Sequence, residues 1–521
     1  MTVQNLIKRR HPAYEALLPH WQFLIDTYEA TVPEWVEGHI HKFYKEGPEE
    51  YKERKARAWR DNVSRDIVEI WTSHLFKVPV VRDGKKAPAP VVEFWKHATR
   101  GADAISIDDL MREASDKSGA VSPCYLVVDM PAAPELEPDQ VLTQAHAQAL
   151  KLRPYAYVVY PVDALDFGLD DDDEFTWFLL REWKRDDEDP FEASGALRER
   201  FRLWTRTHWY LFERVGKNEV SVDGSGVKLI EEGEHPLGRV PVVQLYHKKG
   251  KDRYRAISLL EEIAYKDRAL ANKESQLDAI ICDQTFSQLA IPDAGLIASS
   301  EKTADGRRQK MLKMGTRRVF LFNDQAKHAP MFLSPDASQG QLVLTVIDRL
   351  RQQIYEDALL DSQARTRSGG PRTATEAEQD FEKLGAALAE KAKSLEAAER
   401  KMAELVCLWT KSRYEPAEVA SWVTYPRKFN VKALAEELDE ALKVKQLGDL
   451  GGKFWELYLG RLVRKLLPEL TDAEFATVLE EIRSSHELKA LLMPGAAVSQ
   501  VQAPQGGAET QDAHDEGGEA A

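Results

Sequence analysis

An acidic run is the first feature of this sequence whose residue types could do chemistry. Asp170 to Glu174 places five carboxylates in a row, and hard cations such as Mg²⁺ prefer oxygen ligands. Adjacent carboxylates in one loop, however, point in different directions, and such runs are usually solvated turns. We therefore predict a turn here, and a Mg²⁺-dependent nucleic-acid enzyme stays open as an alternative.

No other pattern typical of an enzyme is present. The sequence contains no GxxxxGK[ST] phosphate loop, no GxSxG elbow and no HExxH pair. His39 and His41 have no third metal ligand nearby, which favours a pair of surface histidines. The cysteines are far apart and odd in number, which predicts neither a disulfide framework nor a zinc cluster; they are Cys124, Cys282 and Cys407. We expect no enzymatic activity, no cofactor and no metal.

Two basic clusters are candidates for contact with DNA or with another protein. Between residues 290 and 335 there are eight Lys/Arg against four Asp/Glu, in a chain whose net charge is -15. The candidate partner-binding residues of this cluster are Arg307, Arg308, Lys310, Lys313, Arg317 and Arg318. The second cluster lies in a loop hinged by Gly369, Gly370 and Pro371, and its arginines are Arg365, Arg367 and Arg372. Charged loops are also common on surfaces without a partner, so both interpretations stay open.

Composition limits the class of protein. The 521 residues are 43% hydrophobic, enough for a sizeable core. No apolar run approaches the roughly 20 residues that cross a bilayer, and the N-terminus lacks the apolar stretch of a signal peptide. We expect a soluble, unsecreted protein with no membrane partner. The net charge argues against binding nucleic acid over the whole surface, because such binding depends on lysine and arginine.

The N-terminal half of the sequence contains a helical pattern followed by a strand pattern. Helices are predicted from Pro12 and from Gly47, the second with Trp59, Val63, Ile67, Ile70 and Trp71 on one buried face. From Pro123 to Tyr246 the pattern becomes short aromatic and β-branched runs separated by acidic or Gly/Pro segments, which predicts strands.

Long helices dominate the rest of the chain. Periodicity predicts one helix over Ile257 to Ala290, a small insertion with a few strands, and a second helix over Ala337 to Leu360. Thr375 with Glu378 fits a capping box at the start of a third helix that ends before Pro416. A helix of roughly 40 residues would span ~60 Å, which exceeds a small domain and suggests that an assembly requires its length.

The apolar stripe of this third helix is Phe381, Leu384, Leu388, Ala392, Leu395, Met402, Leu405 and Trp409, with Glu, Lys and Gln on the opposite face. Beyond it we predict a short extended piece within 421–429 and helices around 433–447, 454–467 and 473–492. The acidic tail after Pro494 has almost no bulky apolar residue, which predicts disorder.

The order of these elements resembles the portal, or head-to-tail connector, proteins of tailed double-stranded-DNA bacteriophages. The similarity covers about residues 10 to 490. It is sharpest in HPLGRVPVVQLYHKKG before the first long helix, in the helix pair around the insertion, and in SGGPRTATEAEQDFEKLGAALAEKAKSLEAAE. The short C-terminal helical unit and the acidic tail depart from what we can match in that family.

The resemblance implies an α+β, portal-like fold. Its parts would be a mixed helical and β wing (1–256), stem helices (257–289 and 337–362), a small α/β clip (290–336), a tunnel loop (363–374), a long helix returning through the wing (375–414), a helical crown (415–495) and the acidic tail (496–521). The chain would then be a structural protein that forms a ring, typically dodecameric, at one capsid vertex.

Function and partners follow from the same resemblance. The ring would be the conduit for packaging and ejecting double-stranded DNA, with Arg365, Arg367 and Arg372 touching it. The basic clip would dock the large terminase and later the head-completion (adaptor) protein, and the ring would contact the major capsid and scaffolding proteins. The location would be the virion, with assembly in the host cytoplasm. A coiled-coil scaffold protein is a further alternative.

Overall fold

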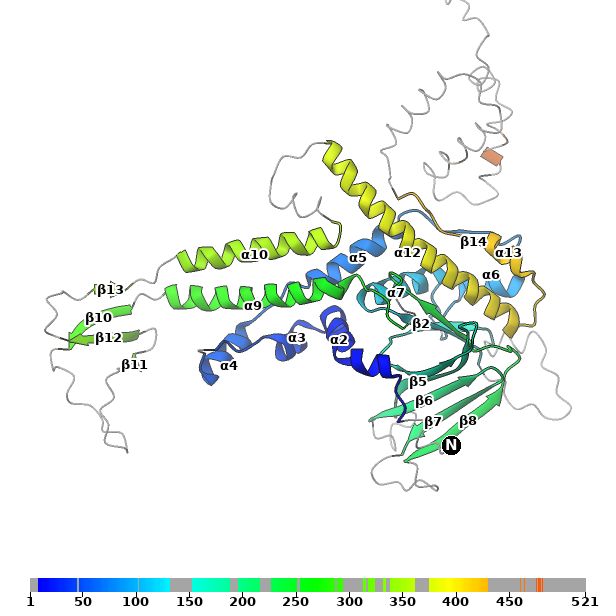
Figure 1. Ribbon diagram of the computed structural model, residues 1–521, viewed down its shortest axis with the longest axis horizontal. Coiled ribbons are helices and arrows are strands. Elements are labelled where there is room, and N and C mark those ends of the chain that lie inside the picture. Colours follow the sequence, from blue (N-terminus) through cyan, green and yellow to red (C-terminus); the bar gives the residue numbers. More distant parts are fainter. Residues whose placement is uncertain are drawn as a thin grey trace, which may run out of the picture. The chain divides into compact units, whose positions relative to one another are not determined.

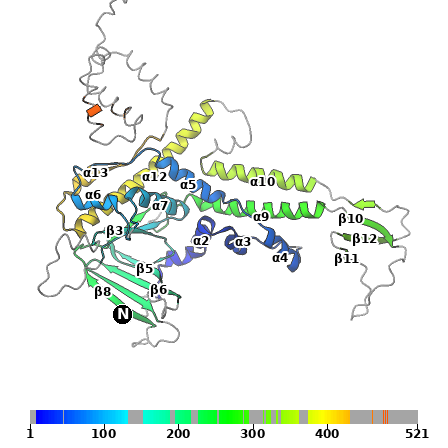
Figure 2. The same ribbon diagram turned by 180° about the vertical axis from the view of Figure 1, so that it is seen from behind.

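The fold combines α-helices with several β-sheets (Figures 1 and 2). The computed structural model describes residues 8–44, 46–101, 103–131, 152–187, 195–215, 226–250, 254–285, 288–293, 313–314, 317–323, 331–333, 338–360 and 374–429, and single positions between 460 and 480. The chain divides into two compact units, Met1–Asn430 and Val431–Ala521. Among the described residues, no helix combines the length and the apolar character that a bilayer crossing needs.

The N-terminal part is helical, as predicted. Its helices are α2 (Pro12–Glu29), α3 (Val32–His39), α4 (Pro48–Arg57), α5 (Val63–Leu75), α6 (Ala89–Lys96) and α7 (Ile107–Ala120). The predicted buried face is confirmed on α5 for Val63, Ile67 and Trp71, but the inclusion of Trp59 is wrong, because the chain breaks between α4 and α5. Asn62 caps α5 by accepting a hydrogen bond from the Arg65 N–H at 3.0 Å. Trp59 lies in the break and is 48% exposed.

A three-stranded antiparallel sheet forms the centre of the first unit. Its strands are β2 (Cys124–Asp129), β3 (Tyr155–Val159) and β9 (Val242–Leu245), in the order β3-β2-β9. Every residue of β2 is buried, because α7 and α12 (Ala374–Trp409) pack against it. These strands fall in the runs that the sequence predicted.

A five-stranded antiparallel sheet packs beside this centre. Its strands are β4 (Ala164–Leu169), β5 (Phe175–Arg185), β6 (Leu197–Thr205), β7 (His208–Arg214) and β8 (Val227–Glu234), in chain order. Side chains alternate between its faces. Phe178 and Trp204 join the main core, while Leu179 and Phe201 form a second cluster on the other face. The aromatic side chains Phe178, Phe201 and Trp204 of these strands are therefore buried in the core.

Two helices flank the small insertion. They are α9 (Leu260–Thr285) and α10 (Ser338–Asp357), both shorter than predicted. After α10, Leu359 adopts φ 59° and the Leu360 N–H donates to the Tyr355 carbonyl at 2.8 Å. This is a helix-ending turn, so the chain cannot remain helical to residue 362. The predicted strands of the insertion are present: β10 (Gln288–Asp293), β11 (Lys313–Met314), β12 (Arg317–Asn323) and β13 (Met331–Leu333).

The helix α12 has 36 residues, about 54 Å at 1.5 Å per residue. Ala374 is already helical, so Thr375 lies inside the first turn and is not the cap that the sequence predicted. The helix ends at Trp409, where Lys411 takes φ 51° and the Ser412 N–H donates to the Cys407 carbonyl at 2.9 Å.

The first unit continues beyond α12 to Asn430, past the boundary at residue 415 that the resemblance implied for the crown. It includes α13 (Pro416–Trp422), which the sequence did not predict, and β14 (Val423–Thr424), which pairs with β1 (Val81–Arg82). Of the second unit, only single helical positions are described. The predicted crown helices therefore lie largely outside the described residues, and the predicted tail lies wholly outside them.

Candidate functional site

The pair α9 and α10 is the first part of the candidate site. Figures 1 and 2 both draw the two helices side by side. Lys266 forms an ion pair with Asp357, and Glu274 pairs with Arg351 at 2.6 Å. Since partners later on α9 lie earlier on α10, the helices run antiparallel. Val343 and Ile347 form the buried stripe of α10 that the sequence predicted.

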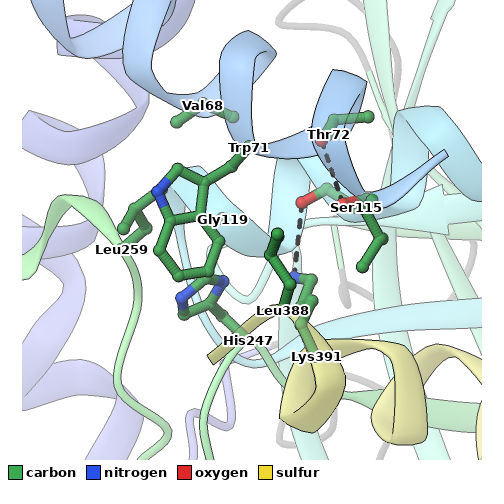
Figure 3. A pocket seen from close by; sticks show the side chains of 10 residues that line it. Val68, Trp71, Thr72, Ser115, Gly119, His247, Leu259, Leu388 and Lys391 are labelled. Atoms are coloured by element: carbon green, nitrogen blue, oxygen red, sulfur yellow. Dashed lines mark hydrogen bonds between the residues drawn. The ribbon is translucent and has the colours of Figure 1, made fainter. Parts of the chain in front are cut away.

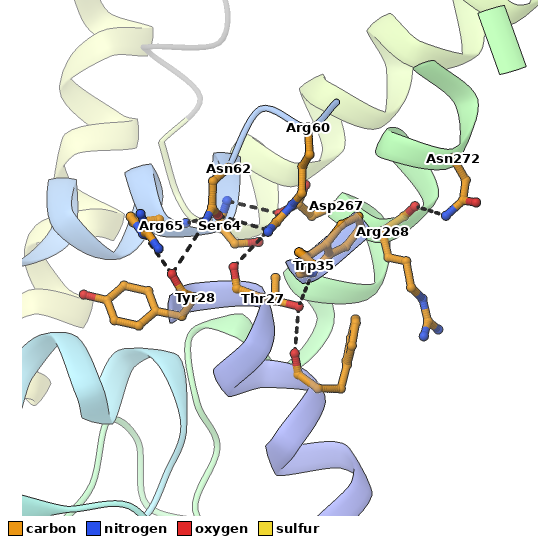
Figure 4. A network of polar contacts seen from close by, with 11 residues as sticks. Thr27, Tyr28, Trp35, Arg60, Asn62, Ser64, Arg65, Asp267, Arg268 and Asn272 are labelled. Atoms are coloured by element: carbon orange, nitrogen blue, oxygen red, sulfur yellow. Dashed lines mark hydrogen bonds and ion pairs between the residues drawn. The ribbon is translucent and has the colours of Figure 1, made fainter. Parts of the chain in front are cut away.

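A buried polar cluster joins α9 to the N-terminal helices (Figure 4). The Arg60 guanidinium donates to Asp267 Oδ2 at 2.6 Å, and both side chains are 1% exposed. Ser64 Oγ donates to the same oxygen at 2.5 Å, while Arg60 also donates to the Thr27 carbonyl at 3.0 Å and stacks on the Trp35 ring at 4.2 Å. The cluster thus fixes α2, α3 and α5 on one part of α9.

The insertion between these helices folds as a four-stranded sheet in the order β11-β12-β10-β13. Strand β10 is parallel to β12 and antiparallel to β13. Of the candidate basic residues, Lys313 and Arg318 occupy directly paired positions on β11 and β12, and Arg317 pairs with Met314. Arg307, Arg308 and Lys310 lie outside the described residues.

The hinged loop between α10 and α12 also lies outside the described residues. This applies to all its candidate residues: Arg365, Arg367, Gly369, Gly370, Pro371 and Arg372. The described chain on both sides of the loop is anchored to α5. Trp71 Nε1 on α5 donates to the Ala358 carbonyl after α10 at 2.8 Å, and α12 packs against the same helix.

The buried face of α12 contains charged side chains that the sequence predicted to face solvent. The predicted apolar positions Leu388 and Leu395 are indeed buried. Lys391, Glu396 and Glu399 are also buried, at 3%, 6% and 1% exposure. A signal was present: Lys391 is three residues after Leu388 and four before Leu395, so it falls on the apolar stripe.

The two buried glutamates attach α12 to the segment after it. Glu399 accepts hydrogen bonds from Arg82 at 2.6 Å and from the Tyr425 hydroxyl at 2.7 Å. Glu396 accepts from Arg427 at 2.8 Å and from the Tyr425 N–H at 2.8 Å. Burial and the neighbouring Glu399 raise the pKa of Tyr425 well above its usual value. The tyrosine therefore stays protonated and keeps donating to the carboxylate.

We expect Glu399→Gln to destabilise the first unit by about 2–4 kcal/mol, because it removes the buried counter-charge of Arg82. Asp108 still pairs with Arg82 at 2.8 Å and limits the loss. Urea unfolding followed by tryptophan fluorescence measures it. Glu390→Gln is the matched control, since Glu390 is exposed on the same helix and should change stability by no more than about 0.5 kcal/mol. Equal losses in the two variants would contradict the anchoring role.

The acidic run forms the turn between β4 and β5, as predicted. Asp170 Oδ1 accepts the N–H groups of Asp172 and Glu174 at 3.1 and 2.8 Å, and Arg206 pairs with the other carboxylate oxygen. His39 lies 3.5 Å from Asp26. Within the part of the chain that the structure describes, no group of three or more His, Cys, Asp or Glu side chains could hold a metal ion.

Comparison with known proteins adds no family to this description. No protein-family model matches the chain, and no curated protein sequence matches it either.

Proposed function

We propose that this chain is the portal subunit of a tailed double-stranded-DNA bacteriophage. The observation that carries the proposal is the order of parts in the first unit. An antiparallel helix pair flanks a small sheet, and α12, the next described element, packs across the central sheet and α5. This is the order that the resemblance implied. Portal function explains why one chain combines a mixed α/β body with three long helices.

The surface of the helix pair supports assembly into a ring. Ile281 on α9 is 52% exposed, and Leu342 and Leu344 on α10 are 66% and 40% exposed. Large exposed apolar side chains on one structural element are typical of a surface that is covered by a partner. In a ring, each helix pair would lie beside the pairs of neighbouring copies and bury these side chains.

The charge of the chain suits a conduit for DNA. DNA must pass through the ring in both directions, and a wall that bound phosphate tightly would stall it. A chain of net charge -15 offers a mostly repulsive wall that keeps the duplex centred. The arginines of the loop at 363–374 would then touch the duplex briefly without trapping it. The basic segment at 302–318 would face the packaging motor and, later, the adaptor protein.

Mass photometry and negative-stain images of the purified chain test the proposal. We expect closed rings with a mass near twelve times 59.1 kDa and a central channel. Rods or small oligomers would instead favour a coiled-coil scaffold. A monomer that cleaves DNA only with Mg²⁺ would favour the enzyme alternative. A protein that is monomeric under every condition and absent from purified virions would overturn the portal assignment.

A further inference from the structure

A buried lysine on α12 lines a small pocket between α12, α5 and α7 (Figure 3). The pocket measures about 10 Å³, about enough for the centre of one water molecule. Its apolar walls come from Val68, Trp71, Leu75, Leu259 and Leu388, and its polar walls come from Thr72, Ser115 and His247. Lys391 points into this space from α12, so its amine lies in surroundings that disfavour a charge.

The hydrogen bonds of Lys391 fit a neutral amine better than an ammonium ion. Nζ donates to Ser118 Oγ and, at 3.4 Å, to the Ser115 carbonyl. Both acceptors are uncharged oxygens, and the carboxylate that acts on the amine electrostatically is that of Asp116. A buried ammonium ion normally has a counter-charge and a partner for each of its three protons. Two neutral acceptors leave a charged Lys391 poorly compensated.

Three titratable groups lie near the amine: Asp116 on α7, Cys124 on β2 and His247 after β9. From α5 come Trp71 and Thr72; from α7 comes Asp116, whose pKa is raised to about 6 by burial. Burial raises the pKa of the Cys124 thiol on β2 to about 12. After β9 lies His247, whose pKa is lowered well below the usual value by burial and then by Lys391 and Lys248. At neutral pH the cysteine and the histidine are therefore both uncharged, whereas Asp116 is mostly ionised and favours the charged form of Lys391.

We propose that Lys391 is a proton-operated latch on α12, which keeps this part of the helix docked while the amine is neutral and favours its release from α5 and α7 when the amine is charged. The latch acts on α12, whose N-terminal end comes directly after residues 361–373. The proposed latch depends only on contacts within the first unit. This inference therefore does not require that the protein is a portal.

The pH window follows from two groups. Burial lowers the pKa of Lys391 to about 7 from an ordinary 10.5, with Cys124 and Asp116 acting in the opposite direction. The released helix therefore binds more protons than the docked helix between pH 7 and 10.5, and docking strengthens as the pH rises through that range. Asp116 has a raised pKa, so docking also strengthens as the pH falls from 6 toward 3.8. Docking is weakest between about pH 6 and 7.

Hydrogen–deuterium exchange of the full-length protein tests the latch. We expect the protection factors of amides at 384–398 to rise at least tenfold between pH 7 and pH 9. In Lys391→Met they should already be high at pH 7 and should change less than twofold. Lys393→Met is the matched control on the same helix, because Lys393 is exposed; it should behave like the wild type.

Two results of this experiment would contradict the latch. A wild type whose protection is constant between pH 7 and 9 would overturn the latch, and so would a Lys391→Met variant that keeps the pH dependence. Lys391→Arg supplies a second test because arginine stays charged in both conditions. Its protection should remain low at pH 9. If Lys391→Met fails to fold, the wild type, Lys393→Met and Lys391→Arg together still decide the question.

Discussion

Asp267→Asn should lower the free energy of unfolding of the first unit by about 3–5 kcal/mol. The substitution keeps the shape of the side chain but leaves the Arg60 guanidinium, 1% exposed, without its counter-charge. Ser64 would also lose the carboxylate oxygen that now accepts its hydroxyl proton. Urea unfolding followed by tryptophan fluorescence measures this loss of stability.

The matched control for this variant is Asp278→Asn, also on α9. Asp278 pairs with Arg57 at 3.3 Å, with side-chain exposures of 36% and 47%, and exposed pairs of this kind contribute at most about 1 kcal/mol. The double variant Arg60→Met/Asp267→Leu should lose much less than Asp267→Asn, because it leaves no unpaired buried charge. If Asp267→Asn proves as mild as Asp278→Asn, the cluster does not hold α9 in place.

Replacing Arg365, Arg367 and Arg372 together by glutamine should reduce the DNA packaged per particle at least tenfold while ring mass stays unchanged. These arginines lie outside the described residues, so this prediction depends on the portal proposal and on their place in the sequence. Phosphate contacts come chiefly from lysine and arginine, and the loop would lose all three of its cations. The measurement is DNA content per purified particle beside mass photometry of the rings.

A control for this variant makes the same change of charge elsewhere. Lys52, Lys85 and Lys393 are exposed on the first unit, and replacing all three by glutamine should leave the packaged DNA within twofold of the wild type. Normal DNA content in the arginine variant would remove the proposed role of the loop. Loss of rings in that variant would show that the arginines act in assembly and not on DNA.

Local patterns of apolar residues predicted the helices and strands that bury one face against a continuous core. The periodicity of α10 and α12 and the β-branched runs of β2, β5 and β9 identified these elements, because burial of one face imposes a repeat of 3.6 or of 2 residues. The basic insertion was likewise expected to contain strands, and it does. The resemblance to portal proteins rests on the same patterns and on their order.

The exact ends of elements were less predictable, because they depend on single backbone conformations. The chain between α4 and α5 carries helical periodicity, yet Asn62 caps a new helix there and Trp59 faces solvent. Left-handed residues at Leu359 and Lys411 end α10 and α12. Neither leucine nor lysine favours that conformation by itself, so the exact positions of these helix ends could not be predicted.

The sequence by itself determined the kinds of most elements, the order of those elements and the sign of the charge in each segment. Only the tertiary structure decided which charged residues are buried and which partners they meet. Arg60 and Asp267 are 207 residues apart, and Arg82 and Glu399 are 317 apart. An ionisable side chain can be buried when packing brings it a partner of opposite charge, or when its burial keeps it neutral, as we propose for Lys391. Neither condition can be predicted from the neighbouring sequence.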